Sequence, residues 1–116
     1  MERGAKRAIV LGATGHVGRL LTLKLLEDDR YSEVRIFARK PFGIAHPGLT
    51  QTQADLLSLE DVRALFNGDV VFCCVGTTKA KTPDKKDYRA IDYGIPVEAS
   101  RLCRENGIPA LIVVSA

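Results

Sequence analysis

The sequence has few cysteines, little net charge and no long apolar segment, and each shortage excludes a class of protein. Cys73, Cys74 and Cys103 are odd in number and two are adjacent, so we expect no disulfide framework. The net charge of +3, from 17 basic and 14 acidic residues, is too small to indicate nucleic-acid binding. His16 and His46 stand far apart with no Cys-x-x-Cys pair nearby, so no metal site is predicted. The sequence shows neither a membrane span nor a signal-peptide core, which predicts a cytoplasmic protein.

What the sequence does contain is enough apolar material for one domain. A chain of 116 residues with 46% hydrophobic residues can form a single core, so we treat 1–116 as one unit. Apolar or β-branched runs predict five strands, at 8–11, 34–38, 50–54, 70–75 and 110–114. Helical spacing predicts three helices between them, at about 17–27, 58–66 (capped by Ser58) and 87–106 (bent near Gly94 and Pro96). The polar, basic segment 77–86 is expected to be a loop.

Strands and helices alternate along the whole sequence, which favours an α/β fold with right-handed crossovers. We predict a Rossmann-type, doubly wound parallel sheet of about five strands in the order 3-2-1-4-5. In such a sheet the ligand binds at the carboxyl ends of the strands, at the switch point between the first and fourth strands. The turns that begin at Gly12 and Gly76 both follow these two strands.

A glycine-rich turn joins the first predicted strand to the first helix. It comprises Gly12, Ala13, Thr14, Gly15, His16, Val17 and Gly18. Its glycines permit a tight turn, a close approach of backbone to a pyrophosphate, and close packing of the helix on the strand. The free amides and dipole at the start of the helix favour an anion there. Because the turn lies between a buried strand and an amphipathic helix, it predicts a dinucleotide site.

The spacing Gly-x-x-Gly-x-x-Gly resembles the short-chain dehydrogenase/reductase superfamily, in its extended and atypical branches. Three later segments, 72–78, 88–93 and 113–116, are similar to successive landmarks of the Tat-interacting oxidoreductase-like group. The resemblance covers nearly the whole chain and implies the N-terminal part of that family's fold, without its C-terminal half.

The resemblance also implies a set of cofactor contacts. In this family an acidic residue after the second strand selects NAD, whereas a basic residue accommodates the phosphate of NADP. Arg39 and Lys40 occupy that place, so NADP is expected in preference to NAD. Asp55 and Leu56 match a pair near the adenine, although Asp55 could equally cap the following helix. The turn of Gly76, Thr77 and Thr78 matches one that passes beneath the ribose and the nicotinamide side.

Catalytic residues are harder to assign. The superfamily normally uses a tyrosine with a lysine four residues later, plus a serine after the fifth strand. Ser115 is in the serine's neighbourhood, but no Tyr-x-x-x-Lys pair occurs in the sequence. We therefore expect a fragment of a longer protein, with a partner chain, a second copy or further residues covering the last strand.

Three functions fit the sequence. The favoured one is the cofactor-binding part of an NADPH-dependent oxidoreductase that acts on a small molecule. The alternatives are a non-catalytic NADP-binding regulator or scaffold, and a flavin or quinone reductase that works without the Tyr-Lys pair.

Overall fold

The five strands form one parallel sheet. The computed structural model describes residues 4–75 and 84–114, so Gly76, Thr77, Thr78 and Ser115 lie outside the described residues. The sheet has the order β3-β2-β1-β4-β5, which confirms the predicted Rossmann-type topology. Its strands are β1 (Lys6–Leu11), β2 (Tyr31–Ala38), β3 (Leu49–Gln53), β4 (Val70–Cys73) and β5 (Ala110–Val113).

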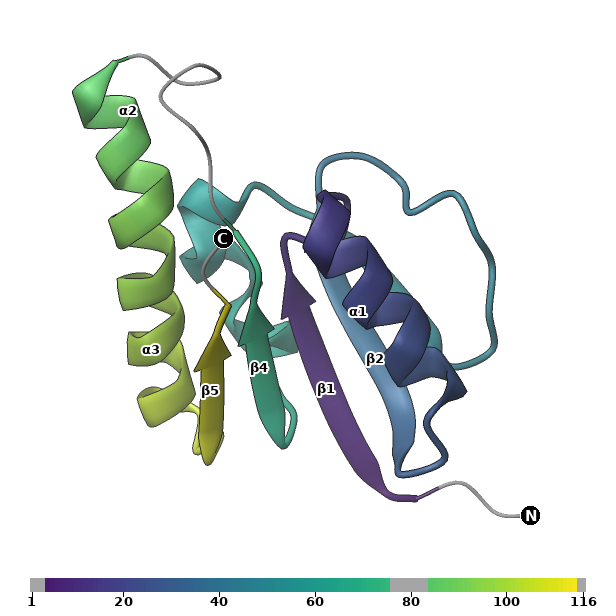
Figure 1. Ribbon diagram of the computed structural model, residues 1–116. Helices are drawn as coiled ribbons and strands as arrows, with labels where there is room; N and C mark the ends of the chain where they lie inside the picture. Colours follow the sequence, from purple (N-terminus) through teal and green to yellow (C-terminus); the bar gives the residue numbers. More distant parts are fainter. Residues whose placement is uncertain (1–3, 76–83, 115–116) are drawn as a thin grey trace.

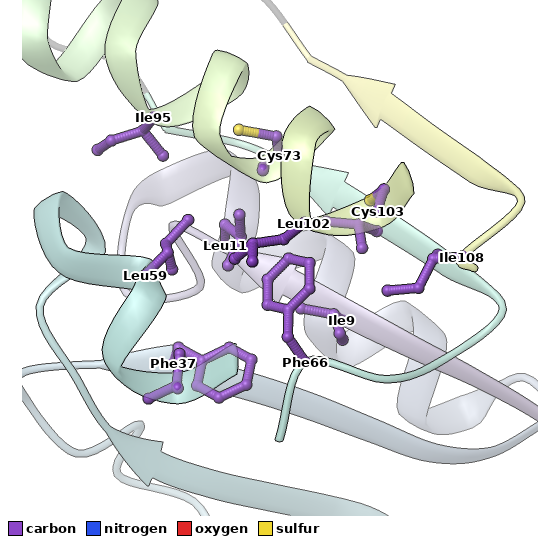
Figure 2. Close-up of a cluster of buried hydrophobic side chains, with 13 residues drawn as sticks. Ile9, Leu11, Phe37, Leu59, Phe66, Cys73, Ile95, Leu102, Cys103 and Ile108 are labelled. Carbon is purple, nitrogen blue, oxygen red and sulfur yellow. The ribbon is translucent and has the colours of Figure 1, made fainter. Parts of the chain in front are cut away.

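Helix α1 (His16–Glu27) covers one face of the sheet, over β1 and β2 (Figure 1). Val10 and Ile36 point toward it and pack with Leu25. Alternate strand residues face the other side, because successive side chains of a strand point in opposite directions. There Leu11 and Phe37 join the larger of the two clusters (Figure 2). Each face of the central strands is therefore buried.

Two helical segments cover that second face. The 3₁₀ segment η1 (Leu56–Leu65) precedes Phe66, whose ring stacks on that of Phe37 with centroids 5.9 Å apart (Figure 2). Helix α3 (Ile95–Glu105) contributes Leu102, which is fully buried. The core that supports the carboxyl ends of β1 and β2 is thus built from η1 and α3.

The prediction that Ser58 caps the second helix is wrong. Asp55 is the N-cap, because its carboxylate accepts a hydrogen bond of 2.9 Å from the Leu57 amide. Ser58 lies inside η1 with a non-helical backbone, as does Val62. The segment consequently forms tight 3₁₀ turns instead of the expected regular helix.

The third helical stretch starts earlier than predicted. Asp84 accepts hydrogen bonds from the amides of Lys86 and Asp87, so α2 (Lys85–Arg89) begins inside the segment expected to be a loop. The expected irregularity near Gly94 is a π turn, η2 (Ala90–Gly94), followed directly by α3.

The crossover from β2 to β3 contains no helix. Residues 39–48 run as a loop along the face that α1 covers, and Phe42 anchors this loop with a side chain only 2% exposed. The segment after Ala38 is therefore a loop that starts at the carboxyl end of β2.

At the other end of the sheet, β5 pairs with β4 and with no other strand of the described residues. Ile112 and Val113 are 47% and 50% exposed. A partner that covers this strand stays a prediction. None of the helices within residues 4–75 and 84–114 has the length and apolar character needed to cross a membrane.

Candidate functional site

A cleft of about 420 Å³ opens at the carboxyl ends of the strands. Parallel strands bring their following segments to one edge, so five stretches distant in sequence meet there. The first four follow β1, β2, β3 and β4, and the fifth is the junction of η2 and α3. The lining comprises Gly12, Ala13, Thr14, Gly15, Phe37, Ala38, Arg39, Lys40, Ala54, Asp55, Leu56, Leu57, Cys74, Val75, Ile91 and Ile95.

The glycine turn forms one end of the cleft and requires glycine at two positions for different reasons. Gly12 has a φ of +82°, in the region that L side chains rarely adopt, and a Cβ there would lie 2.8 Å from the Cys74 carbonyl carbon. Gly18 has ordinary helical geometry, but a Cβ on it would overlap the Gly12 carbonyl oxygen. Both glycines bring backbone segments together, as the sequence predicted.

The start of α1 is suited to an anion. Gly15 is the N-cap and has no side chain to accept a hydrogen bond from the first-turn amides. Gly15 and Thr14 are exposed and line the cleft, so a ligand can approach this helix end. Free amides and the helix dipole together bind phosphate oxygens. This end of the cleft therefore offers the amide groups that an anion requires, and the place of a pyrophosphate here stays a prediction.

Arg39 and Lys40 form a basic end on the same cleft. They directly follow β2, both are exposed, and neither has an ion-pair partner within the part of the chain that the structure describes. Both also line a second hollow of about 310 Å³ between the ends of β2 and β3, with Gln51 and Gln53. Two cations and two side-chain amides therefore line this hollow.

Asp55 has one of the two roles that were weighed for it, the cap of η1. It caps η1 through the Leu57 amide, and it also lines the cleft beside Leu56. Capping fixes the carboxylate near the backbone after β3. Its position beside an adenine stays a prediction.

The apolar walls of the cleft are what sequence reasoning missed. Phe37, Val75, Ile91 and Ile95 line it, and the last two come from η2 and the start of α3. Ile91 and Ile95 are four residues apart, which places them on one side of a helical segment. This spacing is the feature of the sequence from which a shared apolar wall could have been predicted. Cys74 lines the same wall, and burial raises the pKa of its thiol, which keeps it protonated.

Three predicted residues of the turn lie outside the lining. His16 and Val17 are exposed on the first turn of α1, and Gly18 is buried beneath Gly12. Arg19, the next residue of α1, donates a hydrogen bond of 2.8 Å to the Phe42 carbonyl oxygen.

Comparison with known proteins identifies the family of the chain. The family model described as NAD(P)H-binding matches residues 12–116. The chain belongs to this NAD(P)H-binding family. The predicted resemblance to the short-chain dehydrogenase/reductase superfamily and its Tat-interacting group is confirmed.

Two curated relatives match most of this chain but less than half of their own length. Protein HTATIP2 of Rattus norvegicus is 27% identical over 106 residues, covering 88% of this chain and 43% of its own length. Protein FMP52, mitochondrial, of Meyerozyma guilliermondii is 30% identical over 114 residues, with coverages of 95% and 48%. The chain thus spans about half the length of these curated relatives.

Solved structures support the fold. A point mutant of uronate dehydrogenase from Agrobacterium tumefaciens, complexed with NAD, superposes with a TM-score of 0.78 at 23% identity. The match covers 96% of this chain and 41% of the dehydrogenase. The similarity extends over the whole described sheet.

Proposed function

We propose that the chain is the NADPH-binding part of an oxidoreductase that transfers hydride to a small molecule. We prefer NADPH over NADH because of the basic end of the cleft, where Arg39 and Lys40 follow β2. An acidic residue at this position would accept hydrogen bonds from ribose hydroxyls, whereas a guanidinium matches a phosphate. The two cations lack ion-pair partners within the described residues and are available to the 2′-phosphate of NADP.

The rest of the cleft supports a bound dinucleotide. The glycine turn would hold the pyrophosphate at the start of α1, and the apolar wall of Val75, Ile91 and Ile95 would lie against the ring systems. NADPH supplies the hydride when bound, and the protein supplies its position and its electrostatic surroundings. We assign the substrate contacts to the complete protein, because the relatives are about twice as long as the chain.

Titration with NADPH and NADH by calorimetry tests the proposal directly. The protein should be expressed from its complete reading frame, as wild type, Arg39→Ala and Arg104→Ala. Arg104 is an exposed arginine near the end of α3 and outside the cleft lining, so its variant controls for loss of one positive charge. We expect Arg39→Ala to weaken NADPH binding by about 10- to 100-fold, the loss of a charge-assisted phosphate contact, and to leave NADH binding unchanged.

The results separate the alternatives. Equal affinity of the wild type for NADPH and NADH would overturn the choice of NADPH. Tight NADPH binding without turnover of carbonyls, quinones or flavins would favour the regulator or scaffold. The proposed cytoplasmic location is tested by imaging a tagged protein, since FMP52 relatives are described as mitochondrial.

A further inference from the structure

Three interactions converge on Phe42, a buried residue in the loop between β2 and β3. Its ring is buried, and the Arg19 guanidinium carbon lies 4.6 Å from the ring centroid. The Phe42 carbonyl oxygen accepts a hydrogen bond of 2.8 Å from Arg19 Nη1. The Phe42 amide donates one of 2.9 Å to Gln51 Oε1. We call Arg19, Phe42 and Gln51 the Phe42 clasp.

The clasp connects α1, next to the glycine turn, with the loop that follows the basic end of the cleft. Arg19 directly follows Gly18 on α1, where the helix packs against the glycine turn. Phe42 follows Arg39 and Lys40 with only Pro41 between, and proline restricts the backbone at this point. Holding Phe42 in place therefore limits where the two preceding cations can lie. Without the clasp, a loop of residues 39–48 with no helix would let Arg39 and Lys40 move away from the cleft.

The alternative is that Arg19 binds phosphate itself. Its guanidinium already stacks on the Phe42 ring and donates to the Phe42 carbonyl, and the residue is absent from the cleft lining. The Arg19 guanidinium thus already has partners for both interactions within the protein. The geometry therefore favours an indirect role for Arg19, in which it fixes the position of the loop that follows β2.

We propose that Arg19 and Gln51 are positioning residues for nucleotide selectivity, which hold Arg39 and Lys40 at the 2′-phosphate by fixing Phe42. This inference rests on the proposed NADPH preference. It assigns no ligand contact to either residue, and it predicts that selectivity depends on a side chain of α1 outside the cleft.

Adenosine 2′,5′-bisphosphate and AMP are suitable probes, because they differ by the 2′-phosphate alone. The ratio of their dissociation constants should be measured by calorimetry for wild type, Arg39→Ala, Arg19→Ala, Gln51→Ala and Lys24→Ala, all from the complete reading frame. Lys24 is an exposed lysine on α1 and provides the control for a lost charge on the same helix. Thermal unfolding confirms that each variant is folded.

We expect Arg19→Ala to reduce the preference for the bisphosphate by roughly three- to tenfold and Gln51→Ala by about two- to threefold, while Lys24→Ala leaves it unchanged. In an Arg39→Ala background, Arg19→Ala should have little further effect, because the two residues act on one contact. The general stability of the fold does not alter this ratio.

The outcomes distinguish the two proposals. If the wild type shows no preference for the bisphosphate, the proposed NADPH function fails. If Arg39→Ala loses the preference while Arg19→Ala and Gln51→Ala keep it, the clasp is overturned and the function stands. A loss of affinity for both probes by the same factor in Arg19→Ala would assign Arg19 to direct phosphate binding and would also overturn the clasp.

Discussion

The two ends of the cleft, the glycine turn and the basic end, are built by different physical means. At the glycine turn the backbone itself forms the site, and Gly12 and Gly18 are required because neighbouring backbone atoms leave no space for a Cβ. At the basic end, Arg39 and Lys40 are exposed side chains at the start of a loop. The first arrangement cannot be altered without disturbing the packing of α1 on β1. The second can be altered with little effect on the fold, so the proposed function predicts that cofactor preference is separable from cofactor binding.

The largest expected effect comes from Gly18→Ala. A Cβ at this position would overlap the Gly12 carbonyl oxygen, so α1 must move away from the turn. We expect a loss of about 3 kcal/mol or more in the free energy of unfolding, typical of severe overpacking, together with loss of nucleotide binding. Urea denaturation and calorimetric titration measure the two effects.

Gly107→Ala is the matched control for that variant. Gly107 has a φ of +71°, and a Cβ on it would meet no atom within 4 Å. Only backbone strain opposes the added methyl group, so we expect a loss of about 1–2 kcal/mol with unchanged nucleotide affinity. If Gly18→Ala behaved like Gly107→Ala, the close packing described for the turn would be contradicted.

Gly15→Ala separates ligand approach from folding within the same turn. Its Cβ would lie 3.4 Å from the Gly12 carbonyl oxygen, an ordinary contact, and the residue lines the cleft. We expect a cost in unfolding free energy of about 1 kcal/mol or less, but an affinity for NADPH and NADH lower by about tenfold, because the methyl group would stand where phosphate approaches. Unchanged affinity for both nucleotides would place the pyrophosphate elsewhere.

A smaller effect on stability is expected from substitution of Asp55, which lies between the two ends of the cleft. Asp55→Ala removes the cap of η1 and should cost about 1 kcal/mol in unfolding free energy, whereas Asp55→Asn keeps an oxygen that can accept from the Leu57 amide. Comparing the two variants by denaturation and by NADPH titration distinguishes capping from ligand binding. A drop in affinity in Asp55→Asn without a drop in stability would show that the charge itself contacts the ligand.

The features that follow from local backbone chemistry were predictable from the sequence. Apolar runs ending in glycine gave β1 and the turn after it, and the alternation of elements predicted the observed strand order. The glycine turn and the basic residues after β2 were identified as candidate cofactor contacts from their positions relative to the strand ends. Arg39 and Lys40 indeed line the cleft.

The features that depend on distant partners were not predictable. Arg19 pairs with Phe42, 23 residues away, and nothing in the spacing of either residue indicates that contact. The sequence left the cap of η1 open between Ser58 and Asp55, because each side chain can accept a hydrogen bond from a nearby amide, and the structure assigns the cap to Asp55. The π turn before α3 depends on Ile95 bonding to the Ala90 carbonyl, which helical periodicity does not reveal.

The central place of β1 in the sheet also has a consequence for the order of folding. Its pairing with β2 closes a short stretch of chain, whereas its pairing with β4 is fastened by Arg7 and Asp69, which are 62 residues apart. Contacts between residues close in sequence form sooner, because closing a longer loop costs more entropy. We therefore expect β1, β2 and α1 to assemble first and β4 to dock afterwards. Cys74, whose backbone packs against Gly12, arrives only with β4, so the nucleotide should stabilise the final step of folding and give little help to the first.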